Sequence, residues 1–284
     1  MSHDKLAPMA LAAFLLPALT LGLAAGSAFA EIKNVPPKEP VYFAVNEGAT
    51  TQVTVEELTE RYAPLAKSME RILNRPVHVE VYPETARFRA ELARARFDII
   101  FRKTVNLLAA AIRDKQFQAV VKTKNPYVAG FIARKDSPIK SHADLRGKTI
   151  MMPAKVFTTK LGEATLRDLG FKEKDVTIQY TRLQEVVAFS VESGLADVGV
   201  VNPTVKKEWK EKGNPVVLET KPVPNWTIIA SPKFDAATVE RLRAMLVALK
   251  DTEQGMQTLK PISVPEFVAA ENVEYIELLK YIGE

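Results

Sequence analysis

The feature that most constrains the fold of this chain is a local pattern that occurs twice. Each copy runs from a helix end through an apolar residue and an aspartate into a short buried strand and then a polar loop. The copies are residues 89–104, with Phe97-Asp98, and residues 189–204, with Ala196-Asp197. Around them, short apolar strands alternate with helices of amphipathic spacing, which is typical of an α/β fold with parallel strands. Two lobes of similar architecture are therefore predicted.

Two apolar segments are expected to connect these lobes. Residues 127–133 have the pattern of a strand that leads out of the first lobe, and residues 225–230 that of a strand leading back. Lobe one is accordingly expected to comprise residues 31–130 plus 226–284, and lobe two residues 131–225. The aromatic rings of Tyr127 and Trp226 on these connections either line a cleft or pack in the core.

The first thirty residues predict export. A lone lysine precedes the apolar run 6–25, and Ala28-Phe29-Ala30 is a cleavage signature. The alternative is an uncleaved membrane anchor, because the run is nearly long enough to span a bilayer. Pro8, Pro17 and the small residues at the end favour a signal peptide, residues 1–30, and a soluble periplasmic protein after cleavage.

Composition excludes several classes of protein. The chain has no cysteine, which rules out a lipid-modified N-terminal cysteine, disulfides, thiolate metal sites and cysteine nucleophiles. The net charge of +5 is mild and aromatic residues make up 8%, which does not indicate a nucleic-acid binder. His3, His78 and His142 are not spaced for a metal site or a catalytic dyad. We therefore expect no cofactor, no metal and no enzymatic activity.

Hydroxyl and cationic side chains gather at one predicted helix start. Residues 144–171 have the pattern of a turn, a short strand, a polar loop and a helix, with Thr158 and Thr159 at the helix start and Lys155 and Lys160 beside them. Free backbone N–H groups and the positive end of the helix dipole bind anions. The alternative is that the threonines only cap the helix.

A second group of candidates follows the predicted strand that ends at Phe101. The loop begins Arg102-Lys103-Thr104, and the carboxyl edge of parallel strands is where open α/β folds bind ligands. A guanidinium there could hold an oxyanion in a bidentate pair, or the loop could simply be solvated. Neither Arg102 nor Thr158 is expected to belong to the core.

Other polar residues end strands at the same predicted edges. Asn46 and Glu47 end the first strand, and Asn202 follows the strand of the second copy. Glu47 would repel a bare anion but would bind the amine of a zwitterion. Its alternative role is that of a capping or solvent-facing acid.

Two motifs carry a resemblance to a known family. Lys135-Asp-Ser-Pro-Ile139 is followed by Leu145-Arg-Gly-Lys-Thr-Ile150, and later by Gly194-Leu-Ala-Asp-Val-Gly199. In this order they resemble the periplasmic substrate-binding proteins of phosphate, phosphite and phosphonate ABC transporters, over most of residues 40–280. The resemblance implies a type II periplasmic binding protein fold, with two mixed sheets flanked by helices and joined by two hinge strands.

The chain departs from the family pattern at three places, one of which is Arg102-Lys103-Thr104, where the family usually has small or aromatic residues. Where phosphonate-type members have a Ser-Thr-Ser-Gly turn, this sequence has Val156-Phe157-Thr158-Thr159, so two hydroxyls remain and an aromatic side chain enters. Where members often carry a histidine, this chain places Gln184, which can donate a hydrogen bond but cannot gain a charge. Phe157 and Gln184 join the candidate ligand-binding residues.

The resemblance implies a monomeric receptor that captures a small anionic or zwitterionic ligand and delivers it to an ABC permease in the inner membrane. Phosphate, phosphite, phosphonates, sulfur oxyanions and small carboxylates all remain open as ligands. Alternatives are a ligand-sensing subunit for a receptor kinase or, with less support, an enzyme on the same scaffold. Porphobilinogen deaminase is similar in architecture, but it attaches its cofactor through a cysteine that this chain lacks.

Overall fold

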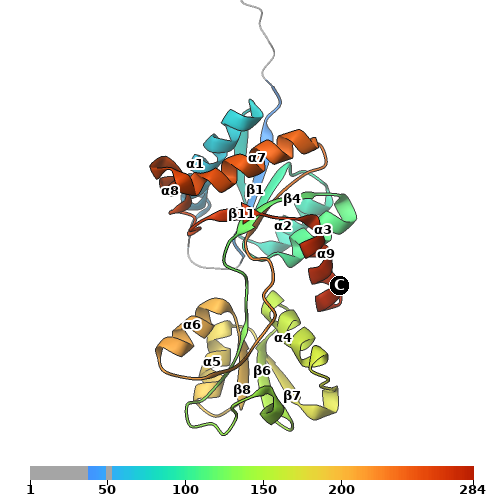
Figure 1. The fold of residues 1–284 in the computed structure, drawn as a ribbon, viewed down its shortest axis with the longest axis vertical. Helices are drawn as coiled ribbons and strands as arrows, with labels where there is room; N and C mark the ends of the chain where they lie inside the picture. Colours follow the sequence, from blue (N-terminus) through green and yellow to red (C-terminus); the bar gives the residue numbers. More distant parts are fainter. Residues whose placement is uncertain (1–37, 49–52) are drawn as a thin grey trace, which may run out of the picture. The chain divides into compact units, whose positions relative to one another are not determined.

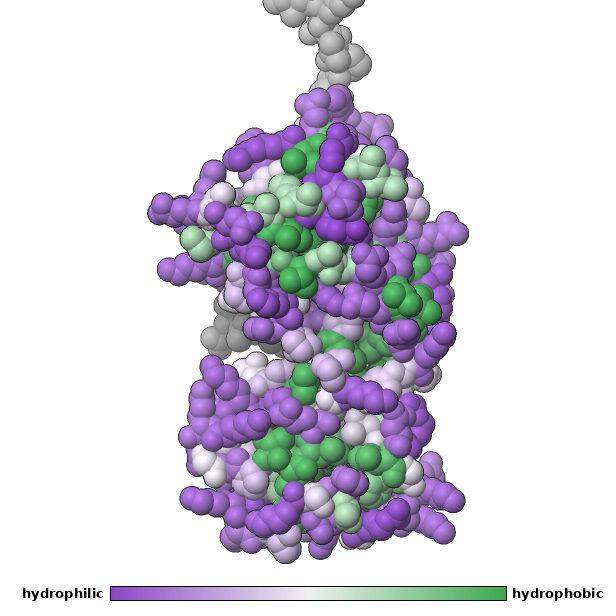
Figure 2. Space-filling view, viewed as in Figure 1, coloured by the Kyte–Doolittle hydropathy of each residue, from purple (hydrophilic) through white to green (hydrophobic). Residues whose placement is uncertain are grey.

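The computed structural model describes residues 38–48 and 53–284 (Figure 1). The predicted signal peptide and its cleavage site lie outside these residues. Across the described ranges, no helix has the length and apolar character needed to cross a membrane. On the face drawn in Figure 2, polar side chains cover most of the surface, as expected for a chain in which 26% of residues are charged.

Lobe one is built on a six-stranded mixed sheet with the order β11-β4-β10-β3-β1-β2. β1 runs parallel to β2 and β3, whereas β10 is antiparallel to β3 and β4. The strands are β1 Val41–Asn46, β2 Val77–Val81, β3 Ile99–Arg102, β4 Gln118–Thr123, β10 Thr227–Ala230 and β11 Phe267–Ala269. The helices are α1 Val55–Leu73, α2 Thr85–Ala93, α3 Asn106–Lys115, α7 Ala236–Ala248, α8 Glu253–Leu259 and α9 Asn272–Ile282.

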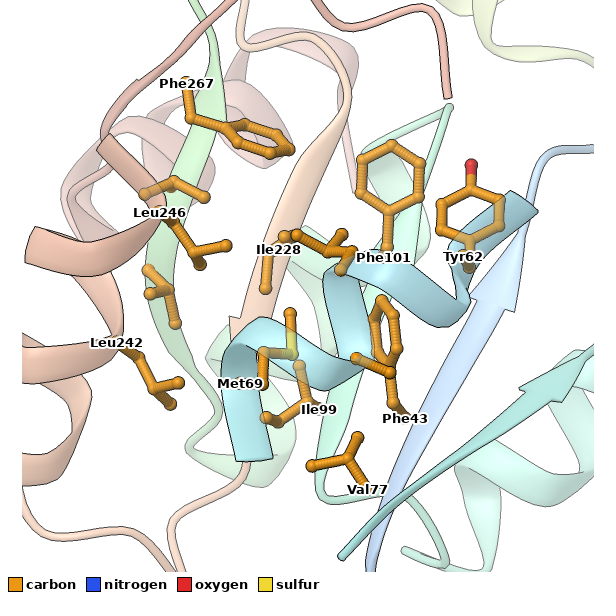
Figure 3. Close-up of a cluster of buried hydrophobic side chains, with 14 of the residues drawn as sticks. Phe43, Tyr62, Met69, Val77, Ile99, Phe101, Ile228, Leu242, Leu246 and Phe267 are labelled. Carbon is orange, nitrogen blue, oxygen red and sulfur yellow. The ribbon is translucent and has the colours of Figure 1, made fainter. Parts of the chain in front are cut away.

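Apolar side chains cover both faces of this sheet. One cluster joins the sheet to α1, α7 and α8, and its rings and aliphatic side chains interleave in Figure 3, where Tyr62 and Met69 of α1 face Phe43, Phe101 and Ile228 of the strands. A second cluster joins the other face to α2, α3 and α9. Burial on both faces explains why β1, β3 and β10 are mostly apolar runs, whereas the edge strand β2 alternates apolar and polar residues.

Lobe two is built on a five-stranded mixed sheet with the order β7-β6-β8-β5-β9. β6 is parallel to β7 and β8, and β5 is antiparallel to β8 and β9. The strands are β5 Gly130–Ala133, β6 Thr149–Pro153, β7 Thr177–Thr181, β8 Val198–Val201 and β9 Val216–Glu219, and the helices are α4 Phe157–Asp168, α5 Gln184–Glu192 and α6 Pro203–Glu211. Short 3-10 turns cover His142–Leu145, Glu173–Asp175 and Leu249–Asp251. The predicted fold class, two mixed sheets flanked by helices, is confirmed.

In both connections between the two sheets, the regular strand is shorter than the sequence predicts. Tyr127 and Val223 form only an isolated antiparallel bridge, and regular strands begin at Gly130 and Thr227. Prolines at positions 126, 222 and 224 flank this bridge. Because proline has no N–H group, a continuous ladder cannot form there. The lobe boundaries at residues 130/131 and 225/226 stay predictions.

The two copies of the sequence pattern have the same structural role. Asp98 accepts the backbone N–H of Tyr42 at 3.0 Å and donates its own N–H to the carbonyl of Tyr42 at 3.0 Å. Asp197 repeats both contacts with Thr149, at 2.8 and 3.0 Å. Each aspartate therefore ties its strand to the start of a parallel neighbour, β1 in lobe one and β6 in lobe two.

The end of α9 contacts α4, so the two lobes meet directly at this point. Tyr281 Oη lies 2.9 Å from Thr165 Oγ1, and Arg167 donates to the carbonyl of Tyr281 at 2.5 Å. Lys160 forms an ion pair with Glu284, the last residue of the chain. The contact is apolar as well, because Phe157 and Leu161 of α4 belong to the same cluster as α3 and α9.

The second glycine of the Gly194–Gly199 motif is required by packing. Gly199 lies on β8 beneath α5, and a Cβ atom built there would lie 2.6 Å from Val187 Cγ1 and 2.9 Å from Val191 Cγ2. Gly162, inside α4, is less crowded, since its nearest neighbour, Val200 Cγ1, would lie at 3.0 Å.

We expect Gly199→Ala to lower the free energy of unfolding by about 1–3 kcal/mol, because α5 must shift to admit one methyl group. Gly162→Ala is the matched control. There, a gain of about 1 kcal/mol in helix propensity offsets the tighter contact, and stability should change little. Urea denaturation of both variants measures the difference, and equal stabilities would show that α5 adjusts without cost.

Candidate functional site

The carboxyl edge of the lobe-one sheet brings Asn46, Arg102 and Thr104 together. Asn46 and Arg102 are cross-strand partners at the ends of β1 and β3. Arg102 Nε donates to Asn46 Oδ1 at 2.8 Å, and Asn46 Nδ2 donates to the Tyr82 carbonyl at 2.6 Å. Arg102 Nη1 donates to the carbonyl and the hydroxyl of Thr104. The guanidinium is thus held in one orientation by neutral acceptors.

Arg102 is a buried cation with no anionic partner. Its residue is 4% exposed, its guanidinium lies 5.7 Å from the Phe88 ring centroid, and no carboxylate pairs with it within 38–48 and 53–284. In the same ranges, Nη2 makes no hydrogen bond. Burial, followed by repulsion from Arg89, lowers the pKa of Arg102 to about 10, so the group stays charged at neutral pH.

The expectation that Arg102 lies outside the core is wrong, and so is a solvated loop at that position. The reason is that Arg102 is still part of β3, where the Asn46 amide and the Phe88 ring cover it. Long cationic side chains commonly bury their stems against apolar groups in this way.

Glu47 and Lys103 form a separate ion-pair network beside Arg102. Lys103 Nζ lies 2.9 Å from Glu47 Oε1 and 4.5 Å from the centroid of the Trp226 ring. Glu47 also pairs with Arg61 at 3.5 Å and accepts a hydrogen bond from Tyr62. Burial and Glu47 together raise the pKa of the Tyr62 hydroxyl well above its usual range. The Glu47 side chain is only 9% exposed, so the alternative that Glu47 is a solvent-facing acid is wrong.

Hydrogen bonds connect Tyr127, which lies on the connection between the lobes, with Thr158, Gln184 and Asn202 of lobe two. Tyr127 Oη lies 2.7 Å from Thr158 Oγ1, and Gln184 Nε2 donates to the same oxygen at 3.3 Å. Gln184 Oε1 accepts the backbone N–H of Asn202 at 3.1 Å. The Asn202 side chain caps α6 by accepting the N–H of Val205 at 2.9 Å. Three predicted site residues are therefore coupled, and Tyr127 joins them.

Thr158, Thr159 and Phe157 are buried, against the expectation for Thr158, because α4 packs on lobe one as well as on its own sheet. Thr159 donates to the carbonyl of Pro153 and borders a pocket of about 470 Å³ that also contains Lys155, Lys160 and Glu284. The Phe157 ring lies 5.2 Å from the Tyr127 ring. Neither threonine caps the helix, so that alternative is wrong.

Three helices that start at these strand ends have apolar N-cap residues. The N-caps of α3, α4 and α5 are Val105, Val156 and Leu183, and none makes a side-chain cap hydrogen bond. By contrast, α1, α6, α7 and α8 are capped by Thr54, Asn202, Asp235 and Thr252. First-turn N–H groups without a cap need another acceptor, and an anion can supply one.

The sequence left two roles open for Tyr127, lining a cleft or packing in the core, because its partner Thr158 lies 31 positions away. The sequence did contain one signal of the site. The N-cap residues of α3, α4 and α5 are apolar, and an apolar N-cap leaves the first backbone N–H groups of its helix without a side-chain acceptor. Within the described ranges, no group of three or more His, Cys, Asp or Glu side chains could hold a metal ion.

Comparisons with known proteins give a family model and similar structures. Residues 47–275 match the model described as ABC transporter, phosphonate, periplasmic substrate-binding protein. XAC2383 from Xanthomonas citri bound to ATP has a TM-score of 0.67 at 17% identity, covering 86% of this chain and 97% of that one. No significant match was found among curated proteins.

Two further solved structures have the same fold. PhnD1 from Prochlorococcus marinus in complex with methylphosphonate has a TM-score of 0.60 at 14% identity, covering 85% of this chain and 96% of that one. The aliphatic sulphonate binding protein SsuA from Escherichia coli has a TM-score of 0.53 at 15% identity, covering 86% and 83%.

Proposed function

Because this chain belongs to the family of ABC transporter phosphonate periplasmic substrate-binding proteins, we propose that it captures a small phosphonate- or sulfonate-like oxyanion and delivers it to an ABC permease. The ligand is held between the strand ends of lobe one and the helix starts of lobe two. The protein acts as a monomer in the periplasm after cleavage at Ala30. Its mechanism is capture of the ligand and not reaction with it.

The observation that carries this proposal is the buried guanidinium of Arg102. A buried charge without a counter-ion raises the free energy of the ligand-free protein. Asn46 and Thr104 hold Nε and Nη1, which leaves Nη2 to bind a ligand oxygen. An oxyanion there replaces the missing counter-ion through a charge-assisted hydrogen bond.

Lobe two supplies the complementary donors. The uncapped starts of α4 and α5 present backbone N–H groups and the positive ends of two helix dipoles. Asn202 lies at the start of a third helix, coupled to Gln184. In this arrangement Thr158 faces the ligand from lobe two, Gln184 holds Thr158 through a hydrogen bond, and Thr159 and Phe157 support the loop from behind.

The environment of Glu47 favours a simple oxyanion over an aminophosphonate. Its carboxylate already pairs with Lys103 and Arg61 and accepts from Tyr62, so an incoming amine would have to displace these partners. The ligands of the similar structures agree with this class. Methylphosphonate, ATP and aliphatic sulphonates each carry a tetrahedral phosphorus or sulfur oxyanion.

Thermal denaturation with a panel of anions tests the proposal. Methylphosphonate, phosphate, phosphite, methanesulfonate and acetate are each added to the wild-type protein. A ligand at one hundred times its Kd adds about 2.7 kcal/mol of stability, and a chain of this length gains about 2–4 °C per kcal/mol. The expected rise in Tm is about 5–11 °C for phosphonate or sulfonate. A rise with acetate alone would reject this ligand class.

A further inference from the structure

The hydrogen bonds that lead from Asn202 through Gln184 to Thr158 have a direction that can be assigned atom by atom. The backbone N–H of Asn202 can only donate, so the Gln184 oxygen faces it and the Gln184 amide nitrogen faces Thr158. That nitrogen can only donate in turn, so Thr158 Oγ1 accepts. The orientation of the Gln184 amide is therefore fixed by the backbone.

One proton of the Tyr127–Thr158 pair is left without an acceptor. Two hydroxyl groups 2.7 Å apart share one hydrogen bond and carry two protons. No further acceptor lies within hydrogen-bond distance of either hydroxyl in the described part of the chain. Both residues are buried, at 8% and 2% exposure, so bulk water is not freely available.

A second buried tyrosine–threonine pair has every proton satisfied. Tyr275 Oη lies 2.9 Å from Thr227 Oγ1, and Thr227 donates its own proton to the carbonyl of Asn225 at 2.6 Å. Tyr275 therefore donates to Thr227, and the chain ends on the protein backbone. The pair at Tyr127 differs because Thr158 accepts from Gln184, and one of the two hydroxyl protons has no acceptor in the described part of the chain.

We infer that Tyr127 is a ligand-binding residue that donates to an unprotonated oxygen of the oxyanion, and that Gln184 and Asn202 are positioning residues that fix this direction. Successive hydrogen bonds of the same direction strengthen one another, so Asn202, Gln184 and Thr158 together make the Tyr127 hydroxyl a better donor. The uncapped start of α4 lies beside the pair and favours an anionic acceptor. This inference rests on the proposed function and names a contact within its site.

Tyr127→Phe tests the inference with methylphosphonate as the probe in calorimetric titration. Its affinity should fall about 10- to 100-fold, the effect of one charge-assisted hydrogen bond. The melting temperature without ligand should stay near that of the wild type, because the ring still packs on Phe157. Tyr275→Phe is the matched control: it also removes one hydroxyl from a buried pair, but it should keep wild-type affinity.

Gln184→Glu tests the direction of the chain separately. An ionised carboxylate at position 184 accepts from Asn202 and from Thr158. Tyr127 must then donate its proton to Thr158, and that proton is no longer available to bind the ligand. The ratio of variant to wild-type affinity should be low at pH 8 and should recover as the pH falls through the pKa of the introduced carboxyl group, because protonation restores a donor. Taking the ratio at each pH removes the ionisation of the ligand itself.

The outcomes separate this inference from the proposed function. If wild-type protein binds no oxyanion of the panel, the proposed function fails. If wild-type protein binds methylphosphonate and Tyr127→Phe binds it equally well, only the role of Tyr127 is overturned. A Gln184→Glu ratio that does not change with pH would reject the assigned direction.

Discussion

Replacing Arg102 by methionine is expected to weaken methylphosphonate binding by about 100-fold while leaving the ligand-free protein close to wild-type stability. The loss follows from removing a buried cation that lacks a counter-ion, since hydrogen bonds to charged groups contribute about 1.5–3 kcal/mol. The near-neutral stability follows from two opposing effects. Methionine leaves Asn46 and Thr104 without a donor, but it also removes an uncompensated buried charge.

Two further variants sharpen this experiment. Arg102→Lys keeps the charge but loses the planar arrangement of donors, so its affinity should lie between those of wild type and Arg102→Met. Arg87→Met is the matched control, because Arg87 is exposed and also lies over an aromatic ring, 5.7 Å from the centroid of Tyr82. Titration calorimetry and ligand-free melting temperatures of all three are compared. Wild-type affinity in Arg102→Met would remove Arg102 from the site.

Phe157→Ala is expected to lower the free energy of unfolding by about 3–5 kcal/mol, the usual cost of deleting a buried ring. Phe157 is 5% exposed, packs on Tyr127 and joins α4 to α3 and α9 in one apolar cluster. Phe157→Leu keeps most of the buried volume and should cost less than about 1.5 kcal/mol.

Urea denaturation followed by tryptophan fluorescence measures these costs, and each lobe has its own probe, Trp226 in lobe one and Trp209 in lobe two. Val156→Ala is the control, because this neighbouring side chain is 37% exposed and should matter little. If Phe157→Ala kept its stability but lost affinity for methylphosphonate, Phe157 would be a ligand contact and not a packing residue.

The sequence was sufficient for the parts of the fold that depend on local patterns. The paired motifs at Asp98 and Asp197, the capping box at Thr54 and the N-cap at Asp235 are each determined by residues a few positions apart. The edge that gathers Asn46 and Arg102 was also predictable, because parallel strands end at the same edge of a sheet.

The details of the site depend on partners that are distant in the chain. The burial of Arg102 requires the amide of Asn46, which lies 56 positions away, and local hydrophobicity does not report that contact. The Phe157 ring could be read as a ligand contact because nothing near it in the sequence shows that α9 covers it. The sequence did not predict that the strand pairing at Tyr127 is only an isolated bridge. The prolines that interrupt the pairing lie in two segments that are distant in the chain.

The contact of α9 with α4 provides a natural position for an optical reporter. Glu284 pairs with Lys160, so the last residue of one lobe lies against a helix of the other. The sequence contains no cysteine, and a single thiol introduced as Glu284→Cys would therefore be a unique attachment point for an environment-sensitive dye. Any separation of α9 from α4 would expose such a dye to water, and its emission would follow the motion of the lobes in real time.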